Sequence, residues 1–90
     1  MKVSFQVYGM VQGVGFRYFV RRQAQELDLA GWVRNEFDGT VSGEAQGDAA
    51  ALEAFRDLLE RGPSGAHITR LDWLPVEEGA ALPVPFAIRM

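Results

Sequence analysis

Polar and apolar side chains alternate through the first eight residues of the chain. The apolar positions of this segment are Val3, Phe5 and Val7. A period of two is typical of a strand with one buried face, so we expect a strand over residues 2–8. From residue 16 the apolar positions recur at helical spacing, as Phe16, Phe19, Val20, Ala24 and Leu27. This spacing predicts an amphipathic helix that ends near Leu29.

Turn-forming residues divide the middle of the chain into a hairpin and a second helix. Residues 30–33 are expected to begin a strand, and Asp38–Gly39 is a strong hairpin-turn signal before a strand over residues 40–45. Asp48 is placed to accept hydrogen bonds from the first free N–H groups of the next helix. The apolar stripe of that helix consists of Ala51, Leu52, Phe55, Leu58 and Leu59, before a stop at Gly62–Pro63.

The last third of the chain contains two further candidate strands. Residues 68–74 alternate through Thr69, Leu71 and Trp73, and a short terminal strand is expected over residues 84–88. The resulting order predicts an α+β fold, a ferredoxin-like split βαβ sandwich. In this fold two helices pack on one face of a mostly antiparallel sheet of four to five strands. No internal repeat or linker interrupts residues 1–90, which we expect to form a single domain.

The composition and net charge of the chain limit the kinds of molecule that it is expected to bind. The 90 residues are 48% hydrophobic and include no cysteine, so a packed core must stabilise the domain without disulfides or thiolate metal sites. The formal net charge of −3 opposes the long-range attraction on which nucleic-acid binders rely. The N-terminal segment has no apolar run that fits a signal peptide or a membrane span. We therefore expect a cytoplasmic protein that binds neither nucleic acid nor membrane.

A glycine-rich segment joins the first strand to the first helix, and it reads GMVQGVGFR over residues 9–17. At the start of a helix, backbone N–H groups lack intrahelical partners and the dipole favours an anion. The spacing matches neither GxGxxG nor GxxxxGKS/T, so nucleotide phosphates with magnesium are not implied. Arg17, in the first helical turn, can give a phosphate two parallel charge-assisted hydrogen bonds. A solvated surface arginine is the alternative interpretation.

A second candidate segment reads GWVRNEFDGTVSGEAQG and covers residues 31–47. Asn35 lies at the end of its first strand, where an amide can both donate and accept hydrogen bonds and so orient a water molecule. A turn-capping side chain is the alternative interpretation of Asn35, and packing on the sheet is the alternative for Trp32. Neither residue decides between chemistry and structure by itself.

Other catalytic arrangements have little support in the sequence. His67 is the only histidine, so a two-histidine metal site is impossible, and we interpret His67 as structural. The carboxylates of Glu36, Asp38 and Glu44 allow a paired acid and base or a magnesium site. Their positions in the hairpin are more typical of solvated turn and edge residues. We therefore expect no metal site.

Together the two segments resemble the paired signatures of the acylphosphatase family, GxVQGVxFR and GWVxNxxDGxVxxxxxG. This sequence matches the first at residues 9–17 and the second at residues 31–47. The chain length, the second helix and the closing residues 86–89 also resemble the family pattern. Met90 is a departure, because many relatives end in an aromatic residue there, and the Ala/Pro-rich stretch before the last strand is another.

The resemblance implies a hydrolase that cleaves the carboxyl-phosphate bond of an acyl phosphate to a carboxylate and inorganic phosphate. It implies that Arg17 binds the phosphoryl group and that Asn35 positions the attacking water. The backbone amides of the loop would contact the other phosphate oxygens, and the residues concerned are Gln12, Gly13, Val14, Gly15 and Phe16. The family uses no metal and no cofactor, and for this chain we expect a monomer whose partner is the small-molecule substrate.

Two other functions remain as alternatives. The same fold hosts RNA-recognition domains, and GFRYFV at residues 15–20 is superficially similar to their aromatic motif, although here it opens a helix. The second alternative is an acylphosphatase-type domain of a larger maturation protein that handles carbamoyl phosphate. The acidic charge balance opposes the first alternative, and the length of the chain opposes the second.

Overall fold

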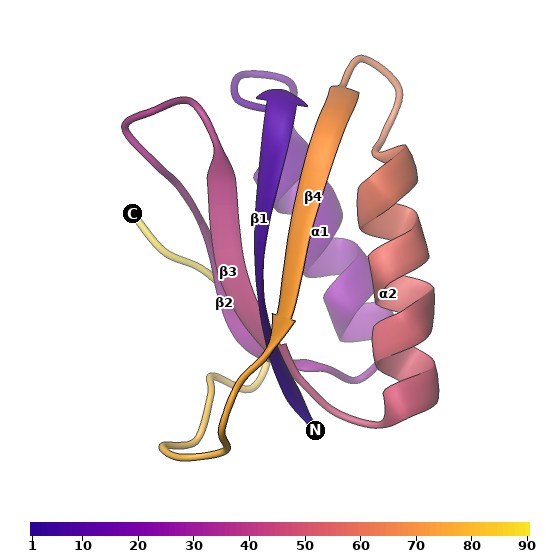
Figure 1. The fold of residues 1–90 in the computed structure, drawn as a ribbon, viewed down its shortest axis with the longest axis vertical. Helices are drawn as coiled ribbons and strands as arrows, with labels where there is room; N and C mark the ends of the chain where they lie inside the picture. Colours follow the sequence, from indigo (N-terminus) through magenta and orange to yellow (C-terminus); the bar gives the residue numbers. More distant parts are fainter.

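The computed structural model describes residues 1–90, in which two helices cover one face of a five-stranded sheet (Figure 1). The elements in chain order are β1 (Lys2–Met10), α1 (Phe16–Glu26), β2 (Ala30–Asn35), β3 (Val41–Gln46), α2 (Ala49–Arg61), β4 (His67–Pro75) and β5 (Ala87–Ile88). The order across the sheet is β4-β1-β3-β2-β5, and every pair is antiparallel except the parallel pair β2–β5. The predicted ferredoxin-like α+β sandwich is therefore confirmed.

Several predicted boundaries differ from the structure. β1 continues to Met10 because a register shift after Tyr8 lets Gly9 and Met10 pair with β4. The first helix ends at Glu26, earlier than expected, because the chain turns at Asp28 with a left-handed φ of 57°. β5 covers two residues rather than five, since Pro85 has no N–H to donate to a neighbouring strand.

The expected side-chain cap of the second helix is wrong. Asp48 stands at the N-cap position with an extended backbone, but its carboxylate makes no capping hydrogen bond. The backbone carbonyl of Asp48 nevertheless accepts the first helical bond from the Leu52 N–H, at 3.0 Å. The helix therefore depends on its packed apolar face, and Leu52, Phe55 and Leu59 are buried there.

The core lies between the sheet and the two helices. Phe55 of α2 is at its centre, with ring-centroid distances of 5.6 Å to Phe5 and 6.0 Å to Phe86, both at steep interplanar angles. Such edge-to-face pairs of buried rings add to the stabilisation from burial itself. Phe86 comes from the segment before β5, so its burial fixes the C-terminal strand against β2.

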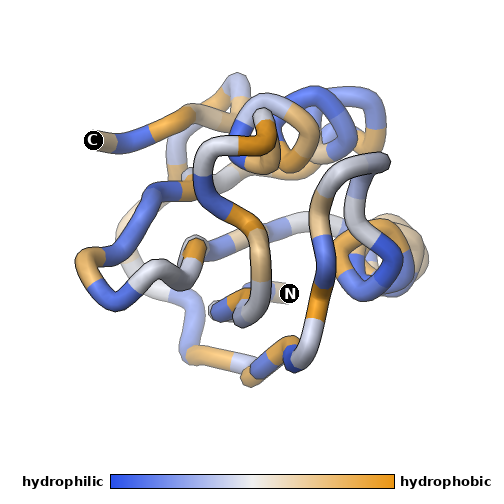
Figure 2. The backbone as a smooth tube through the Cα atoms, turned by 90° about the horizontal axis from the view of Figure 1, so that it is seen from above, coloured by the Kyte–Doolittle hydropathy of each residue, from blue (hydrophilic) through white to orange (hydrophobic).

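The strand directions bring two distant segments to the same end of the sheet. β1 and β2 are both antiparallel to β3, which lies between them, so β1 and β2 run parallel and end at the same edge. The loop after Met10 and the turn after Asn35 therefore lie side by side, at the top of Figure 1. Figure 2 looks down on this end, with polar residues frequent along the exposed turns. Neither helix is long and apolar enough to span a membrane.

Candidate active site

The loop between β1 and α1 depends on glycine for its conformation. Gly13 and Gly15 have φ values of 78° and 75°, in the left-handed region that other residues rarely adopt. A Cβ at either position would meet no atom within 4 Å, so the backbone angle rather than space requires glycine here. Gly15 is the N-cap of α1, and the buried side chain of Val11 anchors the start of the loop.

The backbone N–H groups of this loop have no partner within the protein. The first hydrogen bond after the loop runs from the Phe19 N–H to the Gly15 carbonyl, at 3.1 Å. The N–H groups of residues 12–18 donate no hydrogen bond before it. They include the first turn of an eleven-residue helix, where the dipole adds partial positive charge. The loop can therefore accept an anion with several donors at once.

A hollow of about 160 Å³ lies against this loop. Its lining residues are Val11, Gly13, Gly15, Phe16, Arg17, Tyr18 and Asn35. Arg17 is half-buried and takes part in none of the four ion pairs of the structure. The Asn35 side-chain oxygen Oδ1 is buried without a hydrogen-bond partner. A cation without an ion-pair partner and a residue with an unsatisfied buried acceptor therefore line the same hollow, and a buried acceptor of this kind requires a donor such as water.

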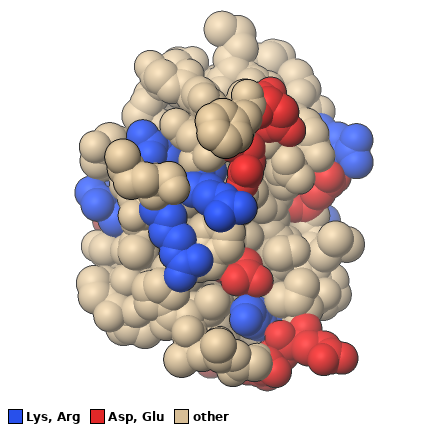
Figure 3. Space-filling view, turned by 90° about the vertical axis from the view of Figure 1, so that its left-hand side faces the viewer, with Lys and Arg blue, Asp and Glu red and all other residues tan.

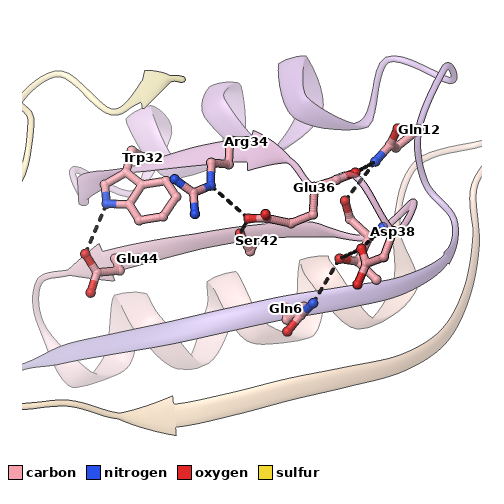
Figure 4. Close-up of polar contacts among 9 residues, drawn as sticks. Gln6, Gln12, Trp32, Arg34, Glu36, Asp38, Ser42 and Glu44 are labelled. Carbon is pink, nitrogen blue, oxygen red and sulfur yellow. Dashed lines mark hydrogen bonds and ion pairs between the residues drawn. The ribbon is translucent and has the colours of Figure 1, made fainter. Parts of the chain in front are cut away.

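The side chain of Gln12 fastens the loop to the β2–β3 hairpin (Figure 4). Its Nε2 donates to the carbonyl oxygen of Glu36 at 2.7 Å and to that of Thr40 at 2.9 Å. The same Thr40 carbonyl accepts the Glu36 N–H at 2.8 Å, which closes the turn. Asn35 immediately precedes this turn, so Gln12 fixes the distance between Asn35 and the loop.

Hydrogen bonds to the carboxylates of Glu36 and Asp38 stabilise the same turn. Arg34 Nε donates to Glu36 Oε2 at 2.8 Å, and the Ser42 hydroxyl donates to the same oxygen (Figure 4). The bonds from Arg34 and Ser42 hold the pKa of Glu36 below its ordinary value of 4.5. Asp38 accepts from the Thr40 hydroxyl at 2.6 Å and from the Thr40 N–H at 3.0 Å, and these bonds lower its pKa. The turn is therefore most firmly held when both carboxylates are ionised.

Most of the sequence matches that of a known protein family. The family model described as acylphosphatase matches residues 3–84. The chain belongs to the acylphosphatase family. Curated acylphosphatases from Salinibacter ruber and Moorella thermoacetica are 49% and 50% identical over 71 and 68 residues. These matches cover 79% and 76% of this chain and 75% and 73% of the two relatives.

Solved structures of the acylphosphatase family have the same fold. The crystal structure of the acylphosphatase from Bacillus subtilis is 36% identical, with a TM-score of 0.88 over 99% of this chain and 98% of that chain. Full-length HypF contains a region that is 32% identical over 99% of this chain, with a TM-score of 0.80, but this is 12% of the HypF chain. A bacterial light-regulated adenylyl cyclase, at 8% identity and a TM-score of 0.67, shares the fold alone.

Five of the seven residues expected at the site line the hollow together, namely Gly13, Gly15, Phe16, Arg17 and Asn35. Phe16 is 1% exposed and packs in the core, so only its backbone can serve the site. Gln12 lies in an adjoining groove of about 590 Å³ that also contains Asn35. Val14 lines neither space and packs against the core. The side chains of Gln12 and Val14 therefore hold the loop in place.

Trp32 and His67 both lie outside the hollow. Trp32 Nε1 donates to Glu44 Oε1 at 3.1 Å, away from the hollow (Figure 4). His67 is exposed at the start of β4 and pairs with Met10 across the sheet. No three His, Cys, Asp or Glu side chains are grouped so that they could hold a metal ion.

The sequence reasoning missed Tyr18 as a lining residue and Thr40 as a partner of Gln12. Tyr18 carries a weak signal, because it directly follows Arg17 in the first turn of the helix. Thr40 is the only buried polar side chain, at 6% exposed, and its hydroxyl both donates to Asp38 and accepts from Gln6. No local sequence pattern predicts the hydrogen bonds from Gln6 and Gln12 to Thr40, since these residues lie 34 and 28 positions away from it.

Proposed function

We propose that this chain hydrolyses acyl phosphates to a carboxylate and inorganic phosphate, with the phosphoryl group in the hollow between Arg17 and Asn35. One observation carries the proposal. Arg17, whose guanidinium has no ion-pair partner, lines one hollow with Asn35, whose Oδ1 is buried without a partner. The same hollow is lined by Gly13, Gly15 and Phe16, whose backbone N–H groups donate no hydrogen bond. Membership of the acylphosphatase family and the names of the curated relatives support the choice of acyl phosphates as substrates.

The reaction needs one displacement at phosphorus. The oxygen of a water molecule held by Asn35 Oδ1 forms a bond to phosphorus, while the bond from phosphorus to the acyl oxygen breaks. The electron pair of that bond leaves with the carboxylate, and the proton of the water passes to a phosphoryl oxygen of the substrate. The lining of the hollow contains no carboxylate and no histidine, so the substrate's own oxygen is the nearest base. A carboxylate is a good leaving group, so this weak base is sufficient.

Charge stabilisation comes from the chain itself. Phosphoryl transfer depends mainly on positioning and on neutralising charge that moves among the oxygens. Arg17 supplies a planar fork of donors that suits two phosphoryl oxygens. The loop N–H groups supply fixed dipoles that need no reorganisation during the reaction. We therefore propose a hydrolysis that needs neither metal nor cofactor.

The proposal is tested by phosphate release from benzoyl phosphate in buffer that contains a chelator. Wild-type protein should release phosphate rapidly, and Arg17→Ala should lose at least about a hundredfold in kcat/KM, by analogy with the loss of an oxyanion donor. Arg61→Ala is the matched control, because Arg61 is exposed at the end of α2 and lines no part of the hollow. Absence of release by the wild type, or equal loss in both variants, would overturn the proposal.

We extend the proposal to a cytoplasmic monomer in which residues 1–90 act as one domain. The fold of one chain brings Arg17 and Asn35 to the same hollow, which supports a site that needs no second copy. Sedimentation of the active protein at a mass near 10.0 kDa would agree with this extension, whereas activity confined to a dimer would contradict it.

A further inference from the structure

An aromatic side chain with a stacked arginine stands at the mouth of the hollow. Tyr18 lines the hollow, yet it is 60% exposed. The Arg21 guanidinium lies over the Tyr18 ring, 5.2 Å from its centroid, as helical spacing of three residues allows. Arg21 takes part in none of the four ion pairs, so its charge is not neutralised by a carboxylate of the chain.

The geometry of the displacement directs the acyl group toward this pair. Attacking and leaving oxygens lie roughly in line through phosphorus. Asn35 is the only lining residue that comes from β2, whereas the other six come from the loop and from α1. A water held at Asn35 therefore attacks from the β2 side, and the acyl group leaves on the side of α1. On that side the ring of Tyr18 is exposed, and the half-buried Arg21 places its guanidinium over this ring.

The surface around the hollow is locally positive, although the chain has a net charge of −3. Arg17 lines the hollow, and Arg21 lies over the ring of Tyr18, which also lines it; neither arginine takes part in an ion pair. Arg34 of the adjoining groove is paired with Glu36. Arg34 and Arg89 both lie over Trp32, at 5.1 Å and 4.8 Å from the ring. Figure 3 shows basic side chains gathered on one face, with acidic side chains directly beside them. The two unpaired guanidinium groups of Arg17 and Arg21 attract a substrate with more than one negative charge.

We propose that Arg21, held over Tyr18, binds a second anionic group on the acyl part of the substrate. The preferred substrates are then acyl phosphates whose acyl group carries its own carboxylate or other anion, in preference to neutral acyl groups of the same shape. This inference rests on the proposed function, because it assumes that a phosphoryl group occupies the hollow.

The test compares two substrates of the same shape, 4-carboxybenzoyl phosphate and 4-carbamoylbenzoyl phosphate. The measured quantity is the ratio of kcat/KM for the anionic substrate to kcat/KM for the neutral one. Arg21→Gln should lower this ratio about fourfold, which is the effect of losing one well-placed but solvent-exposed charge pair. Arg21→Lys should restore part of the ratio, because it restores the charge, and this recovery would not follow from a merely structural role.

Arg22→Gln is the matched control, because it removes the same charge from the next residue of α1. Arg22 is exposed and lines neither the hollow nor the adjoining groove, so its ratio should stay near that of the wild type. An unchanged ratio in Arg21→Gln, or an equal fall of the ratio in both variants, would overturn the inference about Arg21. Hydrolysis of both substrates would still uphold the proposed function in that case. Failure of the wild type to hydrolyse either substrate would overturn both.

Discussion

Replacing Gln12 with alanine should slow catalysis, although this side chain has no part in the proposed contacts with the phosphoryl group. Gln12 Nε2 donates two hydrogen bonds, of 2.7 Å and 2.9 Å, to the carbonyl oxygens of Glu36 and Thr40. These bonds connect the loop between β1 and α1 to the turn that follows Asn35. Gln12→Ala removes both of them, while the loop glycines and Arg17 stay unchanged. The distance between Asn35 and the loop then becomes variable.

The size of the effect follows from the two lost bonds. A hydrogen bond of this kind contributes about 0.5–1.5 kcal/mol net, and Gln12 is exposed, so the pair should contribute about 1–2 kcal/mol. For a chain of this length, that loss lowers Tm by roughly 4–16 °C. A misplacement of about 1 Å between reacting groups costs up to about a hundredfold in rate, and we expect kcat to fall about tenfold.

Urea denaturation and kcat on benzoyl phosphate measure the two parts of this prediction. Gln46→Ala is the matched control, because Gln46 Nε2 also donates a hydrogen bond, at 2.7 Å to Glu78, but at the opposite end of the sheet. The control should keep wild-type kcat. A Gln12→Ala protein with wild-type kcat would refute the argument that Gln12 positions Asn35.

Three further changes have definite expected results. Asn35→Ala should lower kcat for benzoyl phosphate about a hundredfold with little change in KM, since we propose that Asn35 holds water rather than phosphate, and equal changes in both constants would contradict this. Gly15→Ala, at φ 75°, should cost about 1–2 kcal/mol in urea denaturation and weaken inhibition by inorganic phosphate, whereas wild-type values of both would contradict a strained loop. The folded pKa of Glu36 lies below 4.5, so its stabilising contribution is present above pH 4.5 and is lost as the pH falls through the folded value. Glu36→Gln should therefore lose less unfolding free energy than the wild type on acidification below pH 4.5, and parallel acid losses would contradict this.

Much of the fold could be predicted from the sequence because its patterns are local. The alternation through Val3, Phe5 and Val7 corresponds to the buried face of β1, and Asp38–Gly39 forms the hairpin turn. Burial and turn chemistry act over a few residues, so they are visible in the chain itself. The predictions that were wrong concerned the ends of helices and strands and the side-chain cap of α2. The left-handed turn at Asp28 and the register shift after Tyr8 arise from contacts between elements, which periodicity does not report.

The candidate site could likewise be predicted only where its residues follow a local motif or the strand order. Arg17 and the loop glycines lie within one motif, and the parallel directions of β1 and β2 bring Asn35 to the same end of the sheet. The two bonds of Gln12 span 24 and 28 residues, and neither partner is a side chain, so no sequence pattern indicated them. The stacking of Arg21 on Tyr18 is local, but its meaning depends on the position of the hollow.

The most direct test of the proposed mechanism is hydrolysis of benzoyl phosphate by the wild-type protein in water enriched in oxygen-18. In the proposed mechanism, water held by Asn35 next to a phosphoryl group bound by Arg17 attacks phosphorus, so the label should appear in the inorganic phosphate and not in the benzoate. Mass spectrometry of both products after a single turnover shows whether the label entered the inorganic phosphate or the benzoate. Label in the benzoate would mean attack at the carbonyl carbon, and it would contradict the placement of the phosphoryl group in the hollow.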